Sequence, residues 1–590
     1  MNKKEGIKVT GATNSLTSGQ QFIAKTQERQ KKLFINSPII KSVLIISLPS
    51  MIIALMTSLY VFSDQIIMAN LIPNFKPFEN LVGQVEYNDY LRYVSALQST
   101  GIGLNLTEYN SQLIVRNAVT NITPITVFIN AATLLVANGT STNFSKMNGK
   151  LNTKGAQNLW SIGFYCNIIT CGITMILLFS TCHLLVQLEN GNPLKQLANA
   201  SSSIKQACQM AGLSFDDVYT TLENVYVKAN DMILSYSCNY SYIIISGMIL
   251  SMFSSYLSLL IISECKQKMV VIAAIVSNLI NLLFDFVFIY YGQMAMIGGA
   301  IATIIGWAFN CSWYFFQIYL MNKRKETALV YSALKIWGHK WNWELTWNII
   351  SIGLPSFLRN LSMGIATWFQ VFVLATLLIP AIGSGGVTAN DYTNFYGAVN
   401  PIFNLFFPVM LGTIQGSRII GSYLYATENY KRFRQVYWIA MAVGLVYGTF
   451  MFAIVGCALN KYMLFIFQIN NSQVAQVMLM IGMLQMPVYA FTIGGQIIFQ
   501  STGKSLNASI CGLMQGIICN MPITFVMFGT CIAIGDIELF LWNPVFVVLA
   551  SSTIIFIWTV TYIHNHYSPD ILNNNIRWLK RKGYLVPHVK

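Results

Sequence analysis

The sequence is poor in charge, with only 10% Asp, Glu, Lys and Arg among its 590 residues, against 54% hydrophobic residues. Soluble domains carry about 25% charged residues, so a chain built of soluble domains is excluded, as the mean hydropathy of +0.54 also indicates. Apolar runs of roughly 20 residues recur, the length of a helix that crosses a bilayer. The alternating pattern of barrel strands is rare. We therefore expect an all-α integral membrane protein.

Motifs for metal, redox and catalytic chemistry are also missing. The eleven cysteines form no CxxC pair and fall mostly inside apolar runs, which is typical of small buried residues. Only His564 and His566 of the five histidines are close in sequence. No nucleophile elbow, phosphate loop or paired histidine and carboxylate motif occurs near the apolar runs. We expect no enzyme activity, no cofactor and no metal other than Na⁺ as a coupling ion.

Twelve apolar segments are long enough to span a membrane. They cover residues 42–69, 120–141, 158–188, 235–263, 269–291, 296–320, 347–379, 397–420, 434–458, 476–500, 505–530 and 542–564. Most Lys and Arg fall in the tails and loops on one side, which the positive-inside rule assigns to the cytoplasm. We expect a multi-pass protein of the plasma membrane with both termini cytoplasmic.

The net charge of +15 does not indicate nucleic-acid binding. Basic clusters such as 323–325 and 580–582 flank helices, where topology and anionic lipid explain them. The first forty residues are basic and polar and contain no apolar core followed by a cleavage site. They predict a cytoplasmic tail and not a signal peptide.

The two halves of the chain repeat the same features in the same order. Three pairs of residues are offset by the same number of positions: Pro124 and Pro401, Gly139 and Gly416, and Ser145 and Ser422. The sequence at 47–50, Ser-Leu-Pro-Ser, returns at 353–356 as Gly-Leu-Pro-Ser. The same order after an even number of spans predicts two six-helix lobes related by a parallel repeat. Pro49 and Pro355 lie inside spans, where proline removes a backbone hydrogen bond and kinks the helix.

These patterns divide the chain into five expected parts. They are a cytoplasmic tail at 1–41, an N-lobe at 42–320, a cytoplasmic linker at 321–346, a C-lobe at 347–566 and a cytoplasmic tail at 567–590. Two long outer connections of the N-lobe, at about 70–119 and 189–234, are either an external cap or a pair of ordinary insertions.

Two carboxylates remain inside the spans, Asp64 in the first and Asp285 in the fifth. A charge in hydrocarbon costs at least about 2.5–3.5 kcal/mol on insertion scales, so such residues normally face a cavity and serve a function. Asn281 lies one turn before Asp285 on the same helical face, and Thr303 follows on the next span. These oxygens suit H⁺ or a hard cation such as Na⁺. The alternative is that Asn281 and Asp285 only pair polar atoms between helices.

Other polar and aromatic residues of the spans have a simpler explanation. Arg359 and Arg418 lie toward the cytoplasmic side, where snorkelling of the guanidinium group to the membrane surface suffices. Four aromatic residues, Trp307, Trp313, Trp368 and Tyr396, either line a cavity for flat organic molecules or belong to aromatic belts and bundle packing.

The ordered motifs resemble the multidrug and toxic compound extrusion (MATE) family of cation-coupled exporters, from about Lys41 to His566. The resemblance is carried by Leu48-Pro49, Ser58 to Asp64, Asn138 to Ser141, Asn148 to Lys150, Asn281 to Asp285, Gly298 to Thr303, Gly353 to Pro355, Gln415-Gly416 and Gly503-Lys504. It implies two lobes in a V about a central cavity, and a cation site in the N-lobe, with Pro49 bending the first helix. The residues that match this cation site are Asp64, Asn281, Asp285 and Thr303. Spans 7, 8 and 10 hold no acid, unlike some family members, so the resemblance does not extend to a C-lobe cation site.

The resemblance implies a cation-coupled antiporter, driven by H⁺ or Na⁺, that exports amphipathic or cationic organic compounds by alternating access. The expected partners are the lipid bilayer and a small organic substrate, with no nucleic acid and no obligate protein partner. A flippase for a lipid-linked saccharide, in the same superfamily of folds, is the main alternative, and it would need a basic cavity. The repeat disfavours a channel, and the missing motifs disfavour an enzyme.

Overall fold

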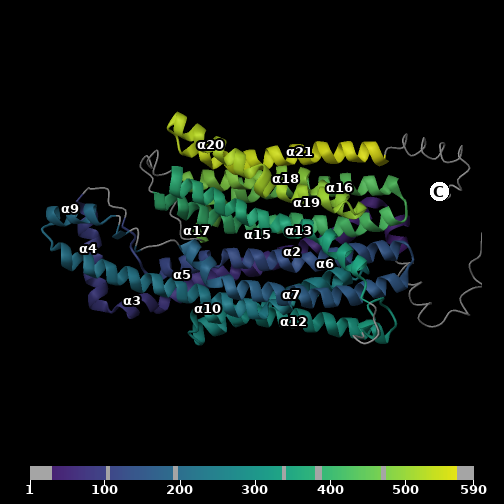
Figure 1. Cartoon of the computed structure of the whole chain (residues 1–590), viewed down its shortest axis with the longest axis horizontal. Coiled ribbons are helices and arrows are strands. Elements are labelled where there is room, and N and C mark those ends of the chain that lie inside the picture. Colours follow the sequence, from purple (N-terminus) through teal and green to yellow (C-terminus); the bar gives the residue numbers. More distant parts are fainter. Residues whose placement is uncertain are drawn as a thin grey trace, which may run out of the picture.

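The protein is a bundle of long helices that run along one axis, as seen in a computed structural model of the chain (Figure 1). The structure describes residues 30–100, 106–190, 194, 197–198, 200–334, 341–378, 389–466 and 473–567. Within these ranges the chain forms helices and no strand. Residues 1–29 and 568–590 of the expected cytoplasmic tails lie outside the described residues. Residues 335–340 of the expected linker at 321–346 lie outside them too.

Twelve long helical segments follow one another in two sets of six. The first set is α2 (Ile39–Leu71), α6 (Thr123–Gly149), α7 (Thr153–Asn190), α10 (Phe215–Ser263), α11 (Gln267–Phe286) and α12 (Ala295–Lys323). The second set is α13 (Trp343–Phe372), α15 (Ala389–Ala426), α16 (Tyr430–Met451), α18 (Gln473–Thr502), α19 (Ser505–Leu513) continued by α20 (Asn520–Ile534), and α21 (Asn543–Tyr567). Eleven segments of the described chain are long and apolar enough to span a membrane, and α15 occupies the remaining position. The expected twelve-span, all-helical class is confirmed.

Proline and asparagine shape these helices locally. Pro49 lies inside α2 and Pro355 inside α13, so each helix lacks one backbone hydrogen bond at that point, while the kinks themselves stay a prediction. The Asn342 side chain caps α13 by accepting hydrogen bonds from the backbone N–H groups of Glu344 and Leu345. Short π-helical turns at 287–291, 373–378 and 452–458 continue α11, α13 and α16.

The two lobes meet along two pairs of helices, α2 with α15 and α6 with α13, which make the most extensive contacts between helices in the described chain. Glycines bring α6 and α13 together backbone to backbone. A Cβ on Gly353 would lie 1.7 Å from the carbonyl oxygen of Leu135, and one on Gly139 would lie 1.9 Å from that of Ile349. No side chain fits at either position without moving a helix.

The second crossing uses the equivalent residues of the repeat. A Cβ on Gly416 of α15 would lie 2.8 Å from the Cα of Ser47 on α2. Gly139 and Gly416 are the repeated glycines, and Ser47 and Gly353 are the residues that precede the repeated Leu-Pro-Ser. Each crossing therefore joins the same two motifs, one from each lobe, which agrees with a parallel repeat.

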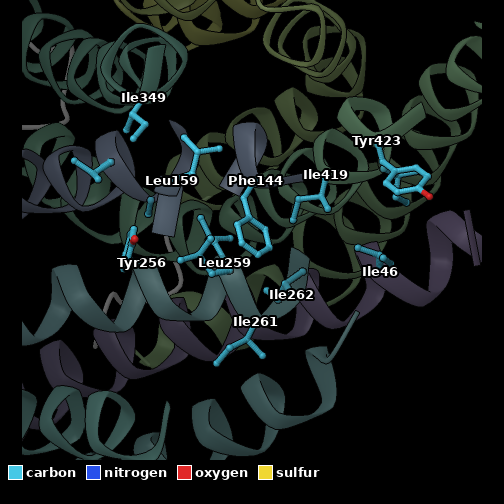
Figure 2. Close-up of a cluster of buried hydrophobic side chains, with 14 of the residues drawn as sticks. Ile46, Phe144, Leu159, Tyr256, Leu259, Ile261, Ile262, Ile349, Ile419 and Tyr423 are labelled. Atoms are coloured by element: carbon cyan, nitrogen blue, oxygen red, sulfur yellow. The ribbon is translucent and has the colours of Figure 1, made fainter. Parts of the chain in front are cut away.

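A hydrophobic core lies beside these crossings and draws side chains from both lobes (Figure 2). Phe144 of α6 lies between Leu259 of α10 and Ile419 of α15, and all three side chains are almost fully buried. Tyr423 of α15 packs edge-on against Phe34 at a ring distance of 5.0 Å. The lobes are thus closed against each other at the end of the bundle where α21 ends at Tyr567.

The two long connections of the N-lobe fold together at the opposite end (Figure 1). They contain α3 (Pro77–Val82), α4 (Gln84–Ser99), α5 (Ser111–Asn121) and α9 (Ser201–Ala211), and we call residues 77–121 and 201–234 the cap. Lys228 and Glu86 join its two parts in an ion pair of 2.8 Å. Helix α10 begins at Phe215, about twenty residues before the span expected at 235–263. The helix therefore extends beyond the expected span, and its polar first turns belong to the cap.

We predict that Gly353→Ala destabilises this form of the protein. The added methyl group has no space against the backbone of α6, and overpacking of this kind costs about 1–3 kcal/mol. Thermal unfolding of purified protein should show a lower melting temperature than for Gly172→Ala, whose Cβ would meet no atom within 4 Å. Equal melting temperatures for the two variants would contradict the close crossing.

Candidate functional site

Three helices carry the four residues predicted to bind a cation. Asp64 lies on α2, Asn281 and Asp285 on α11, and Thr303 on α12, and α11 packs against both α2 and α12. Each of these four residues is at most 3% exposed. The side chain of Asp64 faces those of Asp285 and Thr303, and Asn281 lies one turn from Asp285. The structure thus brings the predicted residues to one place inside the N-lobe.

Most polar atoms of this group have no hydrogen-bond partner among the described residues. They are both carboxylate oxygens of Asp285, Oδ1 of Asp64, both amide atoms of Asn281 and Oγ1 of Thr303. Tyr240 of α10 donates one hydrogen bond, of 3.1 Å, to Oδ2 of Asp64. A buried acceptor without a donor costs about 1–3 kcal/mol, and two facing carboxylates repel each other. Such a set of oxygens fits a proton or a hard cation, which would supply the missing positive charge.

The space beside the carboxylates depends on a glycine. A Cβ on Gly299 of α12 would lie 3.0 Å from Oδ1 of Asp64 and 3.0 Å from the sulfur of Met68. Any larger residue at this position would push against the carboxylate, so the glycine keeps room next to the oxygen that has no partner.

A cavity of about 1470 Å³ lies between the two lobes. It is lined by residues of both lobes and, at the end near the cap, by Thr107, Glu108 and Arg116. Asn281 and Thr303 line it, whereas Asp64 and Asp285 do not, so the carboxylates lie behind the wall formed by Tyr60, Thr303 and Trp307. The candidate cation site and the cavity share this wall.

The cavity wall combines polar and apolar side chains and is almost without charge. Glu108 and Arg116 are the only ionisable Asp, Glu, Lys or Arg side chains among the described residues that line it. Amide side chains are frequent and include Asn130, Asn278, Asn310, Asn360, Asn404, Gln415, Gln485, Gln515 and Asn520. Trp307 and Trp368 also line it, which is the first of the two explanations given for them above. Amides and aromatic rings together suit a molecule with both polar and apolar parts.

Hydrogen bonds between the lobes close the cavity at the end opposite the cap. The hydroxyl oxygens of Ser47 and Ser417 are 3.2 Å apart. Ser145 donates to the backbone oxygen of Ile419 at 2.8 Å, and Asn143 donates to that of Asn348 at 3.3 Å. The structure is therefore a state in which the lobes are joined on the side of the termini.

Snorkelling is the wrong explanation for Arg418. Its side chain is 1% exposed and donates to Oε1 of Gln500 at 3.0 Å and to Oδ1 of Asn138 at 2.5 Å. Arg359 likewise donates to Oε1 of Gln496. Sequence reasoning missed this network because the acceptors are on other helices. The available signal was a pair of glutamines, Gln496 and Gln500, one turn apart in the tenth span.

Clusters of three or more His, Cys, Asp and Glu side chains that could hold a metal do not occur in the described part of the chain. The candidate cation site consists instead of two carboxylates, one amide and one hydroxyl group. This donor set is composed of oxygen ligands, which hard cations prefer.

We predict that Asp285→Asn raises the melting temperature of the protein at alkaline pH without added sodium. The variant removes one of two facing buried charges, and about 1 kcal/mol shifts the melting temperature of a 150–250-residue domain by roughly 2–4 °C. Asp217→Asn, in the exposed part of the cap, should leave it unchanged. A lower melting temperature for Asp285→Asn than for the wild type would mean that favourable contacts stabilise the charged carboxylate of Asp285.

Comparison with known proteins gives matches over most of the chain. Residues 386–526 match the MatE family model. The chain is 27% identical over 509 residues to an uncharacterized protein of Mycoplasmoides gallisepticum, with 84% of each chain covered. It is 25% identical over 540 residues to an uncharacterized protein of Mycoplasma pneumoniae, with 89% of this chain and 92% of that protein covered.

Solved structures share the fold of both lobes. A crystal structure of MATE in complex with MaL6 has a TM-score of 0.64 at 16% identity and covers 90% of this chain and 98% of that chain. An outward-facing multidrug resistance MATE family transporter of the MOP superfamily has a TM-score of 0.64 at 15% identity, with 91% and 98% covered. A MOP superfamily transporter from Pyrococcus furiosus has a TM-score of 0.63 at 17% identity, with 91% and 98% covered. Residues 386–526 thus match the MatE family model, and the two lobes have the fold of MATE transporter structures.

Proposed function

We propose that the protein is a cation-coupled antiporter, driven by H⁺ or Na⁺, that exports amphipathic or cationic organic compounds by alternating access. The observation that carries the proposal is the pair of facing, buried carboxylates, Asp64 and Asp285, directly behind the wall of a large cavity between two lobes. Intramembrane acids in such a position normally mark an ion pathway. We place the protein in the plasma membrane with both termini on the cytoplasmic side, which makes the cap extracellular.

The proposed coupling runs through helix α2. Asp64 and Pro49 are both on α2, and α2 packs against α15 of the other lobe. A bound cation would remove the repulsion between the carboxylates and draw α2 toward α11. Because Pro49 leaves α2 without one internal hydrogen bond, the helix can bend there and alter its contact with α15. Ion binding would then favour one arrangement of the lobes over the other.

The same event would change the cavity that holds the substrate. Thr303 belongs to the candidate cation site and also lines the cavity beside Trp307. A cation that pulls Thr303 inward would reshape this wall, so substrate and cation would oppose each other's binding. Reciprocal coupling of this kind is what an antiporter requires.

The alternative, a flippase for a lipid-linked saccharide, is less well supported by the cavity in the state seen here. A pyrophosphate group would need several basic side chains on the wall. Among the described lining residues Arg116 is the single Lys or Arg, and Glu108 is close to it in sequence.

We predict that Asp285→Asn lowers gradient-driven efflux by at least about tenfold, because an amide takes up no proton and has no negative charge to hold the driving cation. Wild-type and variant protein would be compared in proteoliposomes loaded with a fluorescent organic cation or a neutral fluorescent amphipath. Proton and sodium gradients would be imposed separately, which identifies the ion. Asp217→Asn serves as the matched control. Unchanged coupled efflux in correctly inserted Asp285→Asn protein would refute the mechanism.

A second prediction concerns alternating access. The Ser47 and Ser417 oxygens are 3.2 Å apart, so the double variant Ser47→Cys and Ser417→Cys should form a disulfide across the lobes under mild oxidation. Efflux should stop because the lobes can no longer separate at this end, and a reductant should restore it. Each single variant, treated alike, controls for the eleven native cysteines. Full transport by the crosslinked protein would rule out a separation of the lobes here.

A further inference from the structure

Two arginines of the C-lobe lie inside the bundle without an acidic partner, Arg418 buried and Arg359 half-buried. Arg359 on α13 and Arg418 on α15 form no ion pair with a carboxylate of the described residues, and the Nε atom of each is buried and has no hydrogen-bond partner there. The remaining contacts of their guanidinium groups are with neutral amides. Amides satisfy some of the N–H groups but leave the two charges uncompensated.

Their hydrogen-bond partners Gln496 and Gln500 lie one turn apart on the same face of α18, which brings the two charges into one region of the C-lobe. A guanidinium group in a membrane protein is costly unless it is paired, and unpaired cases normally mark a functional site. Two neighbouring ones raise this cost, so packing alone gives no reason to keep both. The missing component is an anion, and Arg groups bind carboxylate and phosphate with paired hydrogen bonds.

The cavity reaches the vicinity of these arginines. A small void of about 20 Å³, lined by Arg359 and Gln496, lies next to the large cavity. Tyr489 and Gln515 line both spaces and are hydrogen-bonded to each other. Movement of these two side chains would join the void to the cavity and expose Arg359 to its contents.

Separation of the lobes would expose Arg418 as well. Its Nη2 atom donates to Asn138, which belongs to the N-lobe, whereas its other partner, Gln500, belongs to the C-lobe. When the lobes part at this end, Asn138 moves away and Arg418 faces the newly opened space. The cavity would then be basic on its C-lobe side when open toward the termini, and nearly uncharged in the state seen here.

We infer that Arg359 and Arg418 bind an oxyanion, a carboxylate or phosphate group, of an amphipathic substrate that enters from the side of the termini. The inference rests on the proposed export function and narrows its substrate class. The substrate binds when Arg418 is released from Asn138, and it leaves when Asn138 returns and takes up the guanidinium again. The acids of the N-lobe bind the driving cation, and the arginines of the C-lobe bind the substrate.

The test uses full-length protein and two probes that differ only in charge. They are 11-(dansylamino)undecanoic acid and the corresponding carboxamide, and binding is followed by dansyl fluorescence in neutral detergent. We expect the wild type to bind the carboxylate at least about tenfold more tightly, because two guanidinium groups gain a counter-anion. Competition by dihexanoyl phosphatidic acid would indicate a lipid headgroup as the natural source of the anion, and competition by inorganic phosphate a soluble one. In either case the competition must be seen in the wild type and be lost in Arg359→Gln to support the inference.

Three variants separate the arginines from general charge effects. Arg359→Gln should abolish the preference for the carboxylate, and Arg418→Gln should reduce it. Arg359→Lys, which keeps the charge but not the planar fork, should retain part of the preference. Arg324→Gln, at an exposed helix end, should bind both probes like the wild type. Because the wild-type comparison of the two probes requires no variant, poor folding of a variant leaves the test valid.

The outcomes distinguish this inference from the proposed function. Equal binding of the two probes by the wild type, or a preference unchanged in folded Arg359→Gln, would overturn the oxyanion site. Ion-driven efflux of the carboxamide that depends on Asp285 would then still support the antiporter. Conversely, an Arg359-dependent preference without any ion-driven efflux would support the oxyanion site and contradict the antiporter.

Discussion

The lobes touch backbone to backbone where glycine leaves no side chain between them, and this contact decides which end of the cavity is open. Gly353 lies against Leu135 in one crossing and Gly416 against Ser47 in the other. With the crossings closed, Arg418 can reach Asn138, and the core around Phe144 spans both lobes. If the crossings separated, all of these contacts would be lost together, so one movement would open this end of the cavity.

The charges inside the spans that have no ionic partner are divided between the lobes by sign. The N-lobe holds Asp64 and Asp285, the C-lobe holds Arg359 and Arg418, and no ion pair of the described residues joins the two sets. Each set is costly in the absence of a bound ion, because hydrocarbon and neutral amides do not compensate a charge. The protein thus keeps two sites of unfavourable electrostatic energy beside one cavity. A transporter can use such sites, since a ligand that neutralises one of them changes the relative stability of the two lobe arrangements.

The candidate cation site was largely predictable from the sequence, and the arginine network was not. Asp64 and Asp285 were found because a carboxylate is conspicuous in an apolar span, and Asn281 because helical periodicity places it on the face of Asp285. The partner Tyr240 was missed, since it lies on α10 and no local pattern links it to Asp64. Arg418 was misinterpreted because snorkelling depends on whether a neighbouring helix blocks the path to the surface. Gln500 and Asn138 block it here, and both are distant in sequence.

The sequence by itself determined the membrane-spanning helices, their order and the repeat, because each depends on local apolarity and on motifs that recur along the chain. It also determined that two carboxylates, Asp64 and Asp285, lie inside the spans. Only the tertiary structure decided what those groups contact, that the repeated glycines face the repeated Leu-Pro-Ser motifs, and that the long connections form one cap. The reason is physical. Burial in lipid is a property of a segment, whereas hydrogen bonds, cavities and lobe contacts depend on the relative positions of helices far apart in the chain.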